Sequence, residues 1–241
     1  MNRHHTCLLS ILTGLMLSIL TAQDPFVIDT SLSSSLPQSI ANSIEIADVD
    51  NDGYNDIIMS GYDSTRFGLF IDIIKVNSQG ALTSGFSTNF ITYPDTIAEF
   101  SGGLGNLDLS DVNLDGSIDI YLNGSARSEL LMNSSSGYFS ESNWLQNMFV
   151  IHSNGKWGDV NMDGKPDLFL MGVKQPADNI LNELYLNTGT YLDEDPTTIF
   201  PALFTGSSAW GDYDNDGDPD LIIGGQTANP NSSVTRLYQN D

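Results

Sequence analysis

The stretch DYDNDGDPD at residues 212–220 places an aspartate at every second position and a glycine at the sixth. Aspartates packed this closely repel one another, so a folded chain must offset their charge. Three further stretches follow the same pattern, DVDNDGYND at 48–56, DVNLDGSID at 111–119 and DVNMDGKPD at 159–167. All four fit D-x-[DN]-x-D-G-x-x-D, and successive motifs begin 63, 48 and 53 residues apart. Repeats of this length indicate stacked units such as solenoid turns or propeller blades.

The sequence around the four acidic stretches repeats as well. Each is followed by a short apolar run ending near glycine (DIIMSG, DIYLNG, DLFLMG, DLIIGG), and later by one ending in asparagine (IKVN, LLMN, LYLN, LYQN). Short apolar runs bounded by Gly, Asn, Asp and Ser are strand signals, and no segment after residue 23 has a convincing helical period. Each unit is therefore predicted as strand, acidic loop, strand, loop, strand, turn, strand. Four antiparallel strands per unit are the plan of a propeller blade, so the sequence predicts an all-β propeller.

These elements resemble the FG-GAP/VCBS repeat, the calcium-loop blade of integrin-α-like β-propellers. The resemblance rests on the acidic loops, on the preceding Trp-Gly of the third and fourth repeats, and on the L-Y-x-N runs, and it covers nearly all of residues 24–241. It implies blade-like sheets around an axis, with a calcium ion in each acidic loop between the first and second strands of a blade. It also implies a repeat protein that binds metal and takes part in cell adhesion.

The first residues after position 23 align with a later part of the repeat, with Phe26 in the place of Tyr191. This alignment predicts that the chain begins with the last strand of a blade. Two arrangements follow: the N-terminal strand completes the fourth blade of a closed four-bladed ring, or the four repeats are the N-terminal portion of a larger propeller. We favour the larger propeller, because the last repeat carries no cap and propellers have roughly 4 to 8 blades.

The composition limits the partners. The chain of 241 residues has 8 Lys and Arg against 31 Asp and Glu, a net charge of −23, which argues against nucleic acid and anionic membranes and favours cations. Residues 1–23 have a basic residue, an apolar run and small residues before a cut site, so they are predicted to be a signal peptide. A retained membrane anchor is the alternative, but the run is shorter than the roughly 20 residues of a span. We expect a secreted or cell-surface protein, extracellular or periplasmic, with no membrane span after cleavage.

The spacing of oxygen-bearing side chains in each acidic loop is typical of a calcium site. Calcium takes six to eight oxygen ligands, and side chains at alternate loop positions can turn inward to supply them. Glycine at position 6 permits a positive φ, so the chain can turn sharply and direct the carbonyl of position 7 inward. The aspartate at position 9 then closes the cage as the next strand begins. Magnesium is disfavoured, because it requires a smaller octahedral cage with several waters.

We therefore predict about four calcium ions, one in each loop, with a structural role. Ordinary solvated turns are the alternative, since Asp, Asn and Gly favour turns, but turns do not require the acid at position 9. On charge alone, the first and fourth sites should bind calcium most tightly. The predicted ligands are the side chains of positions 1, 3, 5 and 9 and the carbonyl of position 7: Asp48, Asp50, Asp52, Tyr54 and Asp56; Asp111, Asn113, Asp115, Ser117 and Asp119; Asp159, Asn161, Asp163, Lys165 and Asp167; Asp212, Asp214, Asp216, Asp218 and Asp220.

Two classes of function remain open from the sequence. The first is a secreted, non-enzymatic module that binds an extracellular protein or glycan ligand. The second is the propeller portion of a polysaccharide lyase or hydrolase. Against the enzyme, the chain after residue 23 has no cysteine and one histidine (His152), and nearly all clustered carboxylates fall in the acidic loops. We expect no catalytic residues and no organic cofactor. Trp157 and Trp210 are predicted to pack in the core.

Overall fold

A computed structural model describes residues 29–33, 36, 40–63, 68–79, 81–91, 106–123, 128–134, 139–145, 150–174, 179–227, 229 and 232–240. The chain divides into two compact units, residues 1–36 and 37–241. Among the described residues, the first unit contains one short helix, α1 (Thr30–Ser33), and the strands lie in the second. The predicted signal peptide and Phe26 lie outside the described residues. Across the part of the chain that is described, no helix has both the length and the apolar character that a membrane crossing requires.

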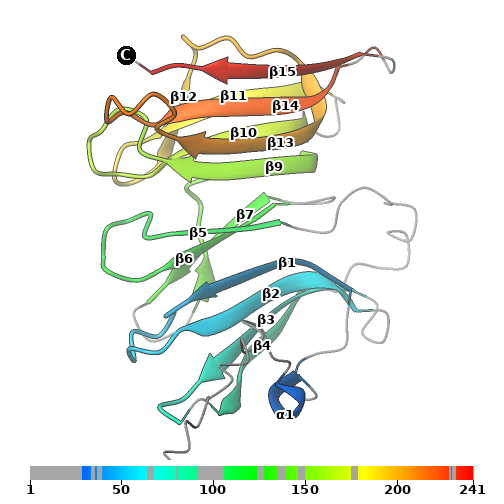
Figure 1. Ribbon diagram of the computed structural model, residues 1–241, viewed down its shortest axis with the longest axis vertical. Helices are drawn as coiled ribbons and strands as arrows, with labels where there is room; N and C mark the ends of the chain where they lie inside the picture. The colour runs from blue at the N-terminus through cyan, green and yellow to red at the C-terminus, as the bar shows by residue number, and fades with distance from the viewer. Residues whose placement is uncertain are drawn as a thin grey trace, which may run out of the picture. The chain divides into compact units, whose positions relative to one another are not determined.

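The described residues between 37 and 241 form four antiparallel sheets, and in each the strands follow one another in chain order (Figure 1). Sheet 1 consists of β1 (Ile40–Ala47), β2 (Asp56–Asp63), β3 (Gly68–Val76) and β4 (Leu82–Ile91). Sheet 2 consists of β5 (Asn106–Ser110), β6 (Asp119–Asn123), β7 (Ser128–Asn133) and β8 (Phe139–Glu141).

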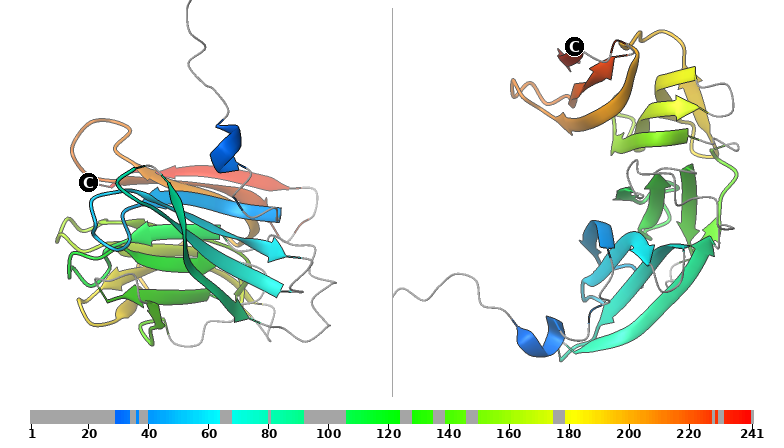
Figure 2. Two further views of the ribbon diagram at one scale, coloured as in Figure 1. Left: turned by 90° about the horizontal axis from the view of Figure 1, so that it is seen from below. Right: turned by 90° about the vertical axis from the view of Figure 1, so that its right-hand side faces the viewer.

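The third and fourth repeats build the other two sheets (Figure 2). Sheet 3 consists of β9 (Val150–Gly158), β10 (Asp167–Lys174), β11 (Asn179–Asn187) and β12 (Leu192–Asp195). Sheet 4 has three strands in the described part of the chain, β13 (Leu203–Gly211), β14 (Asp220–Thr227) and β15 (Ser233–Tyr238).

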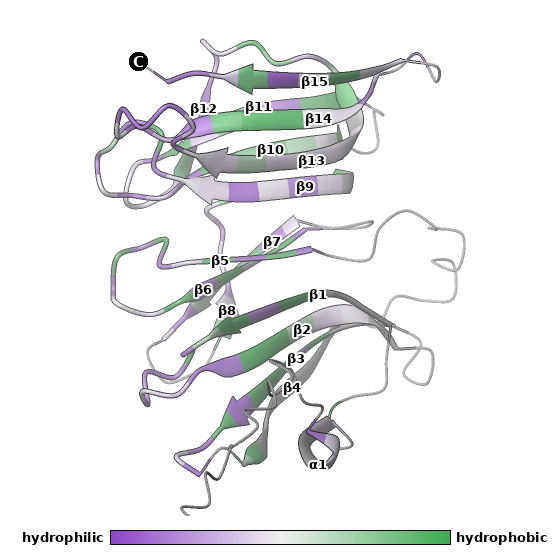
Figure 3. Cartoon of the chain, viewed as in Figure 1, coloured by the Kyte–Doolittle hydropathy of each residue, from purple (hydrophilic) through white to green (hydrophobic). Residues whose placement is uncertain are grey.

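The second strand of a sheet is apolar on both of its faces. Every residue of β6 is buried, as are the first six residues of β10. Successive strand residues point to opposite faces, so continuous burial means that both faces are covered by other elements. Figure 3 shows the resulting contrast between hydrophobic second strands, such as β2, and hydrophilic acidic loops.

The hydrophobic core lies between neighbouring sheets. One cluster joins sheets 1 and 2 through residues such as Ile58 and Ile120. A second joins sheets 2 and 3, where the rings of Tyr121 and Trp157 meet edge to face with centroids 5.7 Å apart. A third joins sheets 3 and 4, with Phe169 at its centre. The sheets therefore stack face to face, as the repeat pattern predicts.

The all-β prediction is confirmed, and the repeats form sheets of three or four antiparallel strands. The order of strands within each sheet agrees with the predicted unit. Closure of the sheets into a ring is not found among the residues that the structure describes, so the propeller itself remains a prediction.

Candidate metal centre

Each acidic sequence connects the first strand of a sheet to the second. We call residues 48–56, 111–119, 159–167 and 212–220 loops 1 to 4 and count positions 1 to 9 along each. The aspartate at position 1 closes the turn: in loop 1 the carboxylate of Asp48 accepts hydrogen bonds from the N–H groups of Asp52 and Gly53, at 3.0 and 2.8 Å. Equivalent bonds of 2.8–3.1 Å are accepted by Asp111, Asp159 and Asp212.

The side chains of positions 3 and 5 also turn toward the loop backbone. In loop 3, Asn161 Oδ1 accepts from the N–H of Asp163, and Asp163 Oδ1 accepts from the N–H of Lys165, both at 3.0 Å. Loops 2 and 4 repeat both bonds. The three side chains therefore converge on the inside of the turn, where oxygen ligands of a cation would have to lie.

The aspartate at position 9 is buried and bridges two strands. Asp119 Oδ2 accepts from the N–H of Val112 at 2.9 Å, and its Oδ1 accepts from the N–H of Asn133, at the end of β7, at 2.8 Å. Burial raises the pKa of Asp119 to about 6, although the two backbone hydrogen bonds act in the opposite direction. Burial likewise raises the pKa values of Asp56 and Asp167. These carboxylates lie in low-dielectric surroundings that disfavour their charged form. A bound cation would stabilise the charged form.

Position 6 takes up a left-handed backbone conformation in every loop, as the sequence predicts. The φ angles of Gly53, Gly116, Gly164 and Gly217 lie between 85° and 105°. A Cβ atom added at any of the four would have no heavy atom within 4 Å. Glycine is therefore needed for its backbone freedom and not for space.

Replacing Gly164 by alanine should lower the free energy of unfolding by about 1–2 kcal/mol, the cost of a left-handed conformation for a residue with a Cβ. Urea denaturation measures this change. The matched control is Gly211→Ala, at a site that is equally open but has no positive φ. Equal losses in the two variants would contradict the conformational explanation.

Position 4 is also left-handed, which the sequence does not predict. Its φ lies between 55° and 63° at Asn51, Leu114, Met162 and Asn215. Asparagine tolerates this region, but leucine and methionine pay a steric penalty there. Loops 2 and 3 therefore hold a strained residue that the hydrogen bonds of the turn keep in place.

Met162→Asn should raise the free energy of unfolding by about 1 kcal/mol, because it relieves that strain at a side chain that is 58% exposed. Denaturation curves of the variant and of Met162→Leu, which keeps the strain, give the comparison. A gain in both variants would show that the backbone conformation is not the cause.

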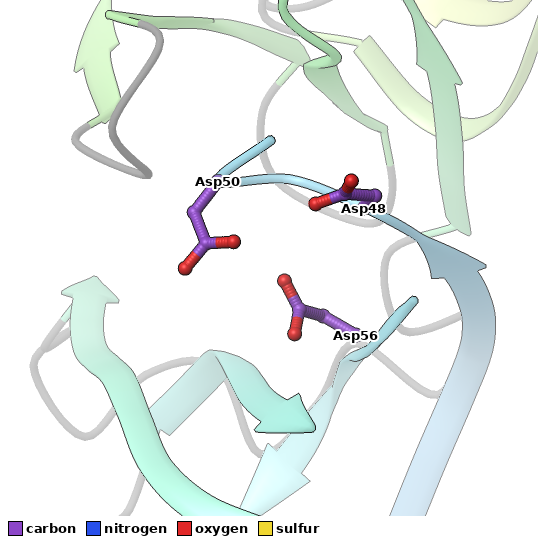
Figure 4. Close-up of side chains that lie close together, drawn as sticks. All are labelled: Asp48, Asp50 and Asp56. Atoms are coloured by element: carbon purple, nitrogen blue, oxygen red, sulfur yellow. The ribbon is translucent and has the colours of Figure 1, made fainter. Parts of the chain in front are cut away.

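Carboxylate oxygens gather in loops 1 and 4. Asp48, Asp50 and Asp56 each place one oxygen within 4.8 Å of the others, and Figure 4 shows the three carboxylates facing a common space. In loop 4 the group consists of Asp212, Asp214 and Asp216, which occupy positions 1, 3 and 5, whereas the group in loop 1 occupies positions 1, 3 and 9. Two ligands on opposite sides of a calcium ion at ~2.4 Å would be about 4.8 Å apart, so these groups fit the ion in size and chemistry. Loops 2 and 3 have asparagine at position 3, so their predicted sets contain one carboxylate fewer.

Basic and amide groups already contact some of the predicted ligands. Lys75, at the end of β3, places its Nζ 2.7 Å from Asp50 Oδ2, and Lys165 pairs with Asp163. The Lys165 hydrogen bond holds the pKa of Asp163 below its usual range. In loop 4 the contact to Asp214 comes from the neutral amide of Gln239, at 2.8 Å. A cation entering loop 1 or loop 3 would therefore compete with a lysine, whereas one entering loop 4 would displace an uncharged donor.

An asparagine at or just after the end of the third strand links each of loops 1 to 3 to the following sheet. Asn133 Nδ2 in sheet 2 donates to the carbonyl of Val49 in loop 1 at 2.6 Å. The same contact, from sheet to preceding loop, runs from Asn187 to Val112 at 2.8 Å and from Asn240 to Val160 at 2.7 Å. The sequence shows this asparagine in all four repeats, but it does not show what the side chain contacts.

The tryptophans before loops 3 and 4 pack as predicted. Trp157 packs against the cluster between sheets 2 and 3, and Trp210 against the cluster between sheets 3 and 4. Trp210 Nε1 also donates to the carbonyl of Lys156 at 3.1 Å. His152 lies in β9. The carbonyl donors predicted at position 7 lie in their turns, and their roles as ligands remain predictions.

A comparison with protein families supports the repeat assignment. The FG-GAP-like repeat family matches residues 111–170 and 159–223, which include loops 2, 3 and 4. A search of curated proteins finds no match.

Solved structures of low sequence identity also resemble the chain. The V. cholerae biofilm matrix protein Bap1 is 18% identical with a TM-score of 0.46, over 83% of this chain and 27% of that one. An Agrocybe aegerita lectin, whose structure concerns recognition of non-reducing terminal N-acetylglucosamine, is 19% identical with a TM-score of 0.44, over 81% of this chain and 51% of that one. The chain thus spans about a quarter to a half of the length of these two proteins.

Proposed function

Because the chain is an FG-GAP repeat protein, we propose that it is a secreted, calcium-stabilised β-propeller module with a binding or adhesion role. The observation that carries the proposal is the shared construction of the four loops. In each, the carboxylate of position 1 accepts two backbone N–H groups, and a buried aspartate at position 9 anchors the next strand. Ordinary turns do not need this combination of inward acids.

Calcium would be held by the side chains of positions 1, 3, 5 and 9, together with the carbonyl of position 7. When bound, it would offset the repulsion between carboxylates that the turn forces together. Two loop positions shape the site without depending on the ion: the glycine at position 6 allows the turn, and the aspartate at position 9 fixes the loop to its sheet. Loop 4 should bind most tightly, because its acids are not paired with a lysine in the described structure and its position 3 is a carboxylate.

Isothermal titration of the chain with calcium tests the proposal, with about four ions bound per chain as the expected result. Asp214→Asn should weaken the tightest site roughly tenfold, since affinity follows the number of charged ligands. Asparagine at this position already occurs in loops 2 and 3, so the fold should tolerate it. Asp193→Asn, an exposed position on β12, is the control that should leave all sites unchanged. An absence of calcium binding would reject the proposed metal role.

The proposed role is binding and not catalysis. Loops carried by rigid sheets commonly hold the residues that contact a ligand. The clustered carboxylates of the described residues accept backbone hydrogen bonds that close the turns and anchor the strands. They do not form a pair of the kind that acid–base catalysis on a sugar requires. A glycan array and a panel of extracellular matrix proteins should detect a ligand. Turnover of a polysaccharide by the purified chain, abolished by substitution of a residue outside the loops, would support an enzyme instead.

A further inference from the structure

The outward face of sheet 4 exposes two apolar residues at positions that are buried in every other sheet. Ile222 is 44% exposed and Leu237, directly opposite it on β15, is 48% exposed. Counted from the position 9 aspartate, Ile222 corresponds to Ile58, Tyr121 and Phe169, and the strand register matches Leu237 with Ile73, Leu130 and Leu184. All six of these counterparts are at most 5% exposed, because the following sheet covers them.

The opposite face of sheet 1 shows the complementary exposure. Ile44 and Ile46 of β1 are 56% and 66% exposed. Strand register matches Ile44 with buried positions in the other sheets, Leu107, Gly155 and Ser208. It likewise matches Ile46 with residues that pack against the preceding sheet, Leu109, Trp157 and Trp210. Sheet 1 therefore presents the face that in sheets 2, 3 and 4 packs against the preceding sheet.

The two exposed faces are the two halves of an interface that occurs three times inside the chain. Contact between them within one molecule would bury Ile44 and Ile222, and both are exposed in the structure. Among the described residues, no sheet packs on either face, and the two faces are complementary in the way that neighbouring faces inside the chain are. The side chains concerned are aliphatic, and aliphatic surface of this kind gains free energy when it leaves water.

The hydrogen bond that links neighbouring sheets inside the chain also has both of its partners available in sheet 1 and loop 4. In each internal interface, the asparagine that ends the third strand donates to the carbonyl of position 2 in the preceding loop. Asn77 occupies this asparagine position in sheet 1, and Tyr213 occupies position 2 in loop 4. Docking of sheet 1 onto sheet 4 would bring this donor and this acceptor together.

We propose that two copies of this chain associate head to tail, with sheet 1 of one copy packed on sheet 4 of the next in the geometry of the internal interfaces. The contact is heterologous, so it either closes into a ring or continues as an open array. Two copies contribute eight sheets, which is within the range of closed propellers. The net charge of −23 opposes association, so the apolar faces must provide the attraction.

Light scattering coupled to size exclusion, at physiological salt with calcium present, tests this association. The unaltered chain should have a mass of two or more copies at micromolar to millimolar concentration. Ile222→Asp and Ile44→Asp should each weaken association on the order of 30-fold, because each places a charge at the centre of the interface. Ile199→Asp, at a residue that is 85% exposed outside both faces, should leave the mass unchanged. Circular dichroism confirms that the variants remain folded.

Mixing the two variants distinguishes head-to-tail association from association through two identical faces. The Ile44→Asp chain keeps its sheet 4 face and the Ile222→Asp chain keeps its sheet 1 face, so an equimolar mixture should form a one-to-one dimer. Association through two identical faces would not be rescued by mixing. A single-copy mass for the unaltered chain at all concentrations, or association that both substitutions leave intact, would overturn the proposal. Closure of a ring within one chain would give the first of these results.

Discussion

Removal of calcium is expected to lower the melting temperature of the chain by at least about 20 °C. An ion that binds only the folded state at ~100 times its dissociation constant adds about 2.7 kcal/mol of stability, and four loops would add roughly 11 kcal/mol if they act independently. For a chain of this size, 1 kcal/mol corresponds to about 2–4 °C. The carboxylates left without a counter-ion would repel one another and add to the loss.

Calorimetry in calcium, in a chelator and in magnesium measures the effect. Magnesium should restore little of the stability, because loops of flexible carboxylates do not form its small octahedral cage. A potassium salt at matched ionic strength separates specific binding from general screening of the negative charge. Identical melting in calcium and in chelator would show that the four loops do not bind calcium in the folded state.

Asp119→Ala should lower the free energy of unfolding by about 2–5 kcal/mol, since two buried N–H groups, those of Val112 and Asn133, lose their acceptor. The carboxylate is fully buried, so water cannot readily replace it. Asp119→Asn should cost less, because the amide keeps one acceptor oxygen. Asp193→Ala, at an exposed carboxylate, is the control and should change stability little.

The decisive comparison for Asp119 is denaturation with calcium and with a chelator. An anchoring role predicts that most of the loss persists in the chelator, because the two hydrogen bonds do not depend on the metal. A role as a metal ligand alone predicts that Asp119→Ala and the unaltered chain are equally stable once calcium is removed. The second outcome would contradict the anchoring role.

The sequence predicts the sheets well because each repeat carries its own strand and turn signals. The acidic loops, the glycine at position 6 and the start of each second strand at position 9 all follow from local pattern. Contacts between distant segments are what the sequence does not reveal. Lys75 lies 25 residues from its partner Asp50, and no local signal marks that pairing.

The sequence does not predict the left-handed conformation of Leu114 and Met162 for a different reason. Intrinsic preference argues against it, and the hydrogen bonds of the surrounding turn override that preference. The asparagine that ends the third strand was visible in all four repeats. Its contact with the preceding loop could not be predicted, because it depends on how one sheet is stacked on the next.

That asparagine contact also determines where the chain can be divided. Loops 1 to 3 each accept a hydrogen bond from the following sheet, as the carbonyl of Val112 does from Asn187. A fragment cut between two sheets would therefore leave one acceptor carbonyl without its donor and expose one apolar face. Unfolding should accordingly spread from neighbour to neighbour, as in a one-dimensional array, with terminal sheets opening first.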